Sequence, residues 1–235
     1  RVRDYISDEL SVLGIKPFTD KLGNLRIKIP GDGPRIMLFA HMDQLGLIVR
    51  QIDENGFLRF ERLGGVPEKM LPGQSVVVST SYGQDFEGVI GIKSHHATRP
   101  DEKYTVLPYR DLYVDLGYGS RDAVRALGID IGNPIVYKPT ADMIAQDRIC
   151  GTSVDDRAGC AVLLEVARQI HQRTNGGEVH IVFTVQEEFN LRGALPAAQQ
   201  IKPDIAIQID LILASDTPDM PDFGEVQLGH GPALS

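Results

Sequence analysis

The stretch Val182-Phe183-Thr184-Val185-Gln186-Glu187-Glu188 is an apolar, β-branched run that ends in two adjacent carboxylates. Such a run is typical of a strand buried in a parallel sheet, and open α/β sheets bind their ligands at the carboxyl ends of the strands. Consecutive side chains of an extended segment point to opposite sides, so Glu187 and Glu188 are expected to have different tasks unless the backbone turns there. Because the two negative charges repel each other, we expect a positively charged partner at this strand end.

Two further apolar runs also end in polar side chains. Residues 36–40 lead into His41 and Asp43, and residues 205–209 lead into Asp210. If these strands are parallel neighbours, their ends meet at one edge of the sheet. One imidazole among several carboxylates suits a divalent cation, with Zn, Co and Mn favoured over metals that prefer soft ligands.

A fourth acidic site, Asp155-Asp156, precedes the segment 158–170, which is apolar nearly all round and is expected to be a buried helix. Either aspartate is able to cap the start of that helix. Taken singly, each acidic strand or helix end has an ordinary structural explanation as a cap, a turn or a solvated end. Their coincidence at four element ends favours a metal site.

Between residues 46 and 138 the α/β pattern gives way to short strand-like runs separated by turns. We predict strands over residues 47–52, 57–62, 75–80, 87–92, 112–116 and 135–137, with one helix over 120–127. The prediction is therefore an α/β domain formed by residues 1–45 and 139–235, with a mostly parallel sheet flanked by helices. Residues 46–138 form an inserted, β-rich, barrel-like or sandwich-like domain.

Composition limits the classes of partner. The chain has 235 residues, of which 42% are hydrophobic and 24% charged, which is ordinary for a soluble protein. Its net charge of −8 argues against nucleic acid or anionic membrane as the main partner. No apolar run approaches the roughly 20 residues that span a bilayer. Cys150 and Cys160 are expected to be reduced, buried thiols, which predicts a cytoplasmic protein.

The order of these motifs resembles the M42 family of metallo-aminopeptidases, which includes tetrahedral, glutamyl and deblocking aminopeptidases. The motifs in question are His41-x-Asp43, Asp155-Asp156-Arg157, Gln186-Glu187-Glu188, and Asp210 with Asp216-Thr217-Pro218. The resemblance covers nearly the whole chain and implies a zinc-peptidase-like fold. It also implies a hydrolase that removes N-terminal residues from peptides.

The resemblance implies two divalent metal ions per subunit, with Zn or Co expected and Mn as the alternative. His41 and Asp210 would bind one ion, Glu188 would bind the other, and Asp155 would bridge the two. A carboxylate suits the bridging position because its two oxygens can hold cations about 3.5–4 Å apart. The peptide bond after Asp155 is expected to be cis.

The catalytic roles follow from the same resemblance. Glu187 would be the general base for attack by a metal-bound hydroxide, and would pass the proton to the leaving amine. Asp43 would accept a hydrogen bond from the other ring nitrogen of His41 and so fix its tautomer.

The family supplies a second metal-binding histidine from a segment beyond residue 235, so we expect the C-terminal part of the subunit to be missing from this chain. The inserted domain is expected to mediate assembly into homo-oligomers, from dimers to dodecamers, or to act as a lid. Two alternatives stay open. A glycan hydrolase is disfavoured by the absence of Trp and by only 6% aromatic residues. A non-catalytic accessory protein with the same fold is disfavoured by the retention of Glu187 beside Glu188.

Overall fold

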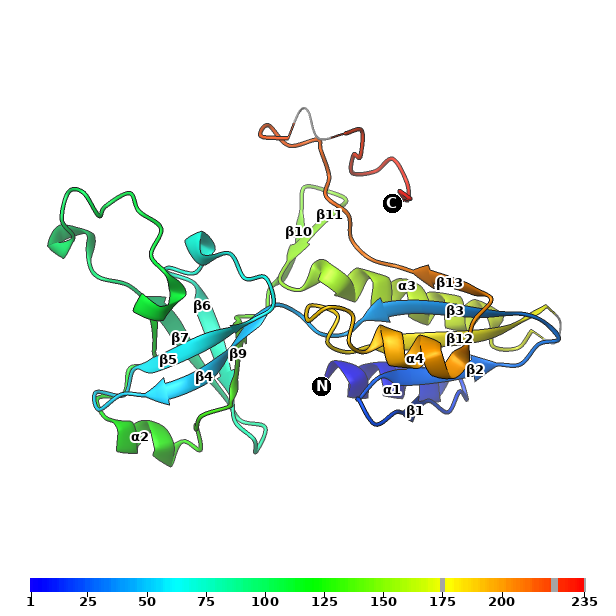
Figure 1. Ribbon diagram of the computed structural model, residues 1–235, viewed down its shortest axis with the longest axis horizontal. Helices are drawn as coiled ribbons and strands as arrows, with labels where there is room; N and C mark the ends of the chain where they lie inside the picture. Colours follow the sequence, from blue (N-terminus) through cyan, green and yellow to red (C-terminus); the bar gives the residue numbers. More distant parts are fainter. Residues whose placement is uncertain (174–175, 221–223, 235) are drawn as a thin grey trace. The chain divides into compact units, whose positions relative to one another are not determined.

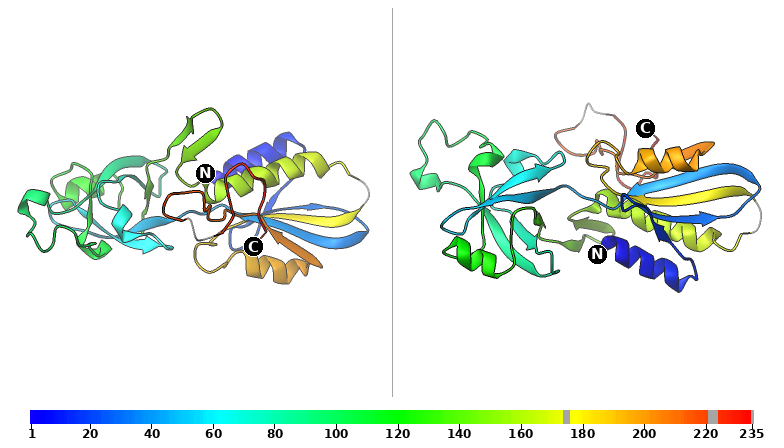
Figure 2. Two further views of the ribbon diagram at one scale, coloured as in Figure 1. Left: turned by 90° about the horizontal axis from the view of Figure 1, so that it is seen from above. Right: turned by 60° about the horizontal axis from the view of Figure 1, so that its bottom comes forward.

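A computed structural model describes residues 1–173, 176–220 and 224–234. They form two compact units (Figure 1, Figure 2). The first unit comprises residues 1–42, 155–185 and 192–235, and the second comprises residues 43–154 and 186–191.

The first unit is built on a five-stranded sheet with the order β1-β2-β12-β3-β13. Its strands are β1 (Phe18–Thr19), β2 (Leu25–Ile29), β3 (Gly33–His41), β12 (Gly177–Thr184) and β13 (Ile205–Gln208). Strands β12 and β13 both run parallel to β3, as predicted, while β1 and β2 are antiparallel. Thr184 pairs with His41, so β12 and β3 end side by side.

Helices cover both faces of this sheet. Successive side chains of β12 point to opposite faces, so neighbouring residues of this strand contact different helices. On one face, α1 (Val2–Val12) and α3 (Val154–Ile170) bury their apolar stripes against Phe183 and its neighbours. On the other face, α4 (Ala194–Ile201) packs against Val182 (Figure 1). None of the helices within the described ranges is long and apolar enough to cross a membrane.

Helix α3 differs from the expectation of a helix buried on all sides. Leu163 and Ala167 are fully buried, whereas Val162 is 47% exposed and Glu165 faces solvent. The helix covers only one face of the sheet, so one apolar stripe is sufficient and the remaining positions contact water.

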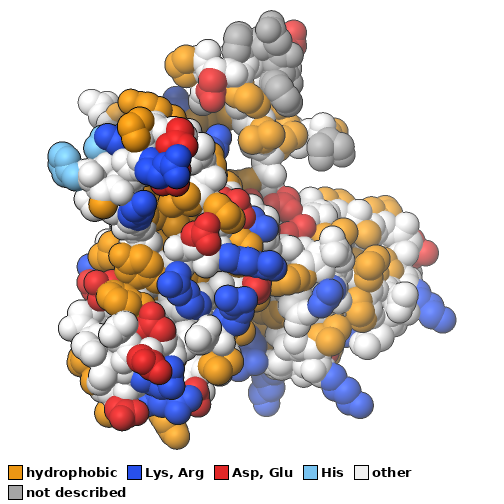
Figure 3. Space-filling view, turned by 60° about the vertical axis from the view of Figure 1, so that its left-hand side comes forward, with side chains coloured by type: hydrophobic (Ala, Val, Ile, Leu, Met, Phe, Trp, Pro, Cys, Tyr) orange, Lys and Arg blue, Asp and Glu red, His pale blue; other side chains and the backbone are white. Residues whose placement is uncertain are grey.

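The second unit contains a closed six-stranded barrel, as the β-rich insertion predicted. The strand order is β4-β5-β8-β7-β6-β9. The strands are β4 (Gly46–Ile52), β5 (Leu58–Leu63), β6 (Ser75–Ser79), β7 (Asp85–Gly91), β8 (Tyr113–Asp115) and β9 (Pro134–Tyr137). Short helices link them, namely α2 (Arg121–Ala126), η1 (Glu68–Met70), η2 (His95–Ala97) and η3 (Tyr109–Asp111). Acidic and basic side chains are interspersed on the face shown in Figure 3.

A two-stranded hairpin, β10 (Ala141–Ile144) and β11 (Arg148–Gly151), was not predicted from the sequence. Every residue of β10 is exposed, as are Arg148, Ile149 and Cys150 in β11. The expectation of two buried thiols was therefore wrong for Cys150, because neither face of the hairpin is covered. Cys160 is buried in α3, and both cysteines are free.

Candidate metal centre

His41, at the end of β3, faces two carboxylates. Its imidazole is only 2% exposed, and Nε2 lies 2.9 Å from Asp155 Oδ1 and 3.8 Å from Asp210 Oδ1. One ligand atom from each of the three residues lies within 4.8 Å of the others. The side chains of Asp155 and Asp210 are 57% and 28% exposed, so the buried imidazole meets carboxylates that solvent ions can reach.

The sheet register explains why Asp210 approaches His41. Strand β13 pairs in parallel with β3, with Gln208 opposite Phe39. One residue further on, the Ile209 N–H donates to Phe39 O at 2.8 Å. Asp210 therefore follows directly beside the end of β3, as the prediction of parallel neighbouring strands requires.

Asp155 reaches the site from the start of α3, where the backbone is not helical. Asp155 and Asp156 have ψ values of 109° and 49°. The peptide bond between them is cis, as the resemblance implied. Of the two aspartates, Asp156 supplies the helix cap, since its Oδ1 accepts the Gly159 N–H at 2.9 Å. The two neighbours thus have separate tasks, and only Asp155 is free to face the imidazole.

The first turn of α3 also holds the backbone of His41 at both of its polar groups. The His41 N–H donates to Asp156 Oδ2 at 3.2 Å, and its carbonyl oxygen accepts a hydrogen bond from Cys160 Sγ at 3.2 Å. Both bonds are buried. Gly159 leaves room for this arrangement, because a Cβ there would lie 2.5 Å from both carboxylate oxygens of Asp156. We call Asp156, Gly159 and Cys160 the α3 clamp.

Sequence reasoning did not find the contact between the α3 clamp and His41. Asp156 is fully buried, and burial raises the pKa of its carboxyl to about 6. The N–H donors of Gly159 and His41 lower this pKa, and the nearby charge of Asp210 raises it. The available signal was the paired Asp155-Asp156 itself, because adjacent carboxylates seldom share one environment.

The remaining predicted residues belong to the second unit, where the backbone turns sharply after β12. Gln186 has a φ of 57°, and the Asp43 carboxylate accepts the N–H groups of Glu187 at 3.1 Å and Glu188 at 3.3 Å. Asp43 thus fixes the backbone that carries both glutamates. Its expected bond to the His41 ring, the metal-binding role of Glu188 and the basic role of Glu187 stay predictions.

The donor set of His41, Asp155 and Asp210 fits a divalent cation that takes nitrogen and oxygen ligands, such as Zn, Co or Mn. Four of the five other histidines have the following surroundings. His180 Nε2 lies 2.8 Å from Glu178 Oε1, and His171 Nδ1 lies 2.8 Å from Arg168 O. His95 and His96 are exposed in η2.

The family model described as M42 glutamyl aminopeptidase matches residues 23–235. The chain belongs to this M42 family. SgcX of Escherichia coli (strain K12) is 39% identical over 219 residues, which are 92% of this chain and 58% of SgcX.

Two solved peptidase structures share the fold. Aminopeptidase APDkam598 from the archaeon Desulfurococcus kamchatkensis superposes with a TM-score of 0.89 at 35% identity, covering 99% of this chain and 63% of its own. The TET1 peptidase of Pyrococcus horikoshii superposes with a TM-score of 0.82 at 31% identity, covering 88% of this chain and 62% of its own. This M42 chain therefore spans about three fifths of the length of these relatives.

Proposed function

We propose that the protein is a metal-dependent aminopeptidase that hydrolyses N-terminal residues from peptides. The observation that carries this proposal is the convergence of His41, Asp155 and Asp210 at one end of a parallel sheet in an M42 chain. Two divalent ions are proposed, Zn or Co with Mn as the alternative. The catalytic domain is assigned to residues 1–45 and 139–235.

The metal-binding roles are proposed residue by residue. His41 and Asp210 would hold one ion, Asp155 would bridge both, and Glu188 would hold the second. When bound, such cations lower the pKa of water and polarise a carbonyl, which is the chemistry that peptide hydrolysis needs. The α3 clamp would hold the backbone of His41, and with it the buried imidazole, in the same position whether or not an ion is bound.

The proton transfers are assigned to this chain's own residues. The Glu187 carboxylate would accept a proton from the attacking water and deliver it to the nitrogen of the leaving amine. Asp43 supports this role because it fixes the Glu187 amide. In addition, Asp43 would orient the His41 ring.

Assembly is proposed for the inserted domain of residues 46–138, which would join subunits or cover the active site. The TET1 peptidase of Pyrococcus horikoshii assembles into a tetrahedron or a large octahedral shell. A homo-oligomer of cytoplasmic subunits acting on peptides is the corresponding proposal for this protein.

The deciding experiment compares peptides with free and with acetylated N-termini in the presence of Zn or Co. We expect amino acids to be released only from free N-termini. Glu187→Gln is expected to keep metal binding, measured by calorimetry, and to lose about 10²–10⁴-fold in rate. Asp147→Asn, at a side chain 80% exposed in the hairpin turn, is the matched control and should change neither property. Full activity of Glu187→Gln would refute the assignment of the general base, and cleavage of acetylated peptides would refute the aminopeptidase.

A further inference from the structure

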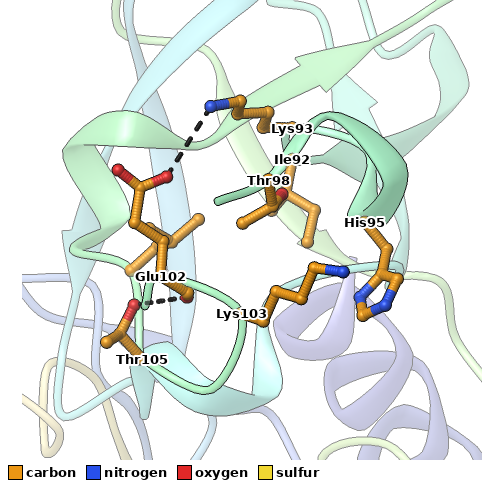
Figure 4. A pocket seen from close by; sticks show the side chains of 8 residues that line it. Ile92, Lys93, His95, Thr98, Glu102, Lys103 and Thr105 are labelled. Carbon is orange, nitrogen blue, oxygen red and sulfur yellow. Dashed lines mark hydrogen bonds and ion pairs between the residues drawn. The ribbon is translucent and has the colours of Figure 1, made fainter. Parts of the chain in front are cut away.

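The loop between β7 and η3 encloses a cavity of its own. Residues 92–108 make up this loop, and every residue that lines the cavity lies between Ile92 and Leu107. The cavity has a volume of about 140 Å³ (Figure 4). Compact surface loops packed by their own side chains frequently have a function.

The charges in the cavity do not balance. Lys93 Nζ is paired with Glu102 Oε2 at 3.6 Å. Lys103 is only partly exposed, and among the described residues no carboxylate lies within ion-pairing distance of its ammonium group. The lysine and glutamate side chains of the lining together carry one net positive charge, which a single negative charge would neutralise.

The positions of the side chains separate the cavity into two sides. In Figure 4, Lys103 and His95 point toward one another at one side, while Lys93 reaches Glu102 at the other. The hydroxyl groups of Thr98 and Thr105 donate to backbone carbonyls of the loop, at 2.8 and 2.7 Å. Among the lining side chains that the structure describes, Lys103 and His95 are therefore the polar groups with no hydrogen-bond or ion-pair partner.

The apolar part of the lining indicates what the anion carries. Ile92 and Leu107 contribute the aliphatic surface of the cavity. From these features we propose that the loop binds a small aliphatic carboxylate. Its carboxylate would contact Lys103 and His95, and its short chain would lie against Ile92 and Leu107. Such a combination of apolar walls and a few convergent polar groups is typical of small-molecule sites.

The test is binding of 4-methylpentanoate to the whole chain, measured by saturation-transfer NMR and calorimetry. Its neutral counterpart 4-methylpentan-1-ol and inorganic phosphate serve as comparison probes. Lys103→Met, which keeps the length of the side chain without its charge, should weaken carboxylate binding about tenfold or more. Lys103→Arg should retain most of the affinity. Lys69→Met removes an exposed lysine of η1 elsewhere on the barrel and is the matched control.

The outcomes separate the alternatives. Carboxylate binding that is lost in Lys103→Met and retained in Lys69→Met supports the site. Equal binding of the alcohol, equal weakening by both methionine variants, or binding of phosphate alone would each overturn it. No step of the experiment measures peptidase activity, so its result is independent of the proposed function.

Discussion

A single carboxylate, that of Asp156, holds two backbone N–H groups, one of His41 and one of Gly159. An asparagine side chain at this position has only one oxygen, so its amide nitrogen would face one of the two donors. The charge of Asp156 is therefore less important than its two acceptor atoms. Asp156 is not one of the three candidate ligands, but it holds the backbone of His41 through a buried hydrogen bond.

Asp156→Asn is predicted to weaken Zn binding about 10–100-fold, which is typical when a residue that supports a ligand is changed. The affinity is measured by calorimetry on the metal-free chain. Asp147→Asn replaces an exposed aspartate and should bind Zn as tightly as the unaltered chain. If Asp156→Asn bound Zn with undiminished affinity, the α3 clamp would have no part in positioning His41.

Glu178 provides a test that depends on pH. Its carboxylate lies 2.6 Å from Lys28 Nζ, 2.8 Å from Arg35 Nε and 2.8 Å from His180 Nε2. These hydrogen bonds lower the pKa of Glu178 from 4.5 to about 2, and the hydrogen bond from Lys28 has the largest effect. Because the folded pKa is depressed, the stabilisation is fully present above about pH 4.5 and is lost as the pH falls through about 2.

Glu178→Gln should therefore be less stable than the unaltered chain at pH 7, and the difference should shrink as the pH falls below 4.5. Urea unfolding at several pH values measures this difference. Glu54→Gln, at an exposed turn of the barrel, should show no comparable trend. A constant difference between Glu178→Gln and the unaltered chain at all pH values would contradict the assignment.

At the scale of elements, the first turn of α3 is expected to favour glycine over alanine at position 159, although helices usually favour alanine. Alanine at a helical position is normally about 1 kcal/mol more favourable than glycine. At Gly159, however, a Cβ would lie 2.5 Å from the carboxylate oxygens of Asp156, and buried neighbours have little room to move. Packing should therefore decide the effect of a substitution here.

Gly159→Ala is predicted to lower the free energy of unfolding, since overpacking costs about 1–3 kcal/mol. Ala161→Gly, at an exposed position of the same helix, should lower it by about 1 kcal/mol through propensity alone. Thermal and urea unfolding provide both values. A gain in stability for Gly159→Ala would contradict this prediction, because it would mean that the Asp156 carboxylate can shift to accommodate the added Cβ.

Most elements were predictable because their sequences contain both a periodicity and clear turn signals. The barrel strands alternate between Gly- and Pro-containing turns, and β3 and β12 are apolar runs of the expected length. The hairpin β10–β11 was missed because its turn contains Ala145, which adopts a φ of 54° where glycine or asparagine is usual. Its strands also bury neither face, so they lack the alternation that indicates a strand.

The candidate site was predictable to the same extent. Strand and helix ends mark where polar side chains gather, so His41, Asp210 and the pair Asp155-Asp156 were candidates from their positions, and the resemblance selected Asp155 from the pair. The role of Asp156 as helix cap and as support for the His41 backbone was not predictable. It depends on a local, non-helical backbone geometry that neither periodicity nor spacing expresses.

At the scale of the whole molecule, the barrel has the properties of an independent folding unit. All residues of its core cluster lie between Leu47 and Ile135, and its sheet closes on itself. A closed sheet leaves no strand edge to be covered by other parts of the chain.

The fragment of residues 43–154 is therefore predicted to fold on its own, with β-type circular dichroism and a single cooperative urea transition. Val114→Asp, at a fully buried barrel position, should abolish that transition in the fragment. A fragment that unfolds without cooperativity would show that the barrel depends on the rest of the chain.

Strand β13 leaves the five-stranded sheet open. It pairs with β3 on one side, and within the described residues its outer side pairs with no strand. Ile205 and Ile207 are 47% and 48% exposed beside that row of free amide and carbonyl groups. Another extended chain can pair with such an edge through backbone hydrogen bonds. The chain at high concentration should therefore self-associate through added strands, and light scattering should detect less of this association in Ile207→Lys.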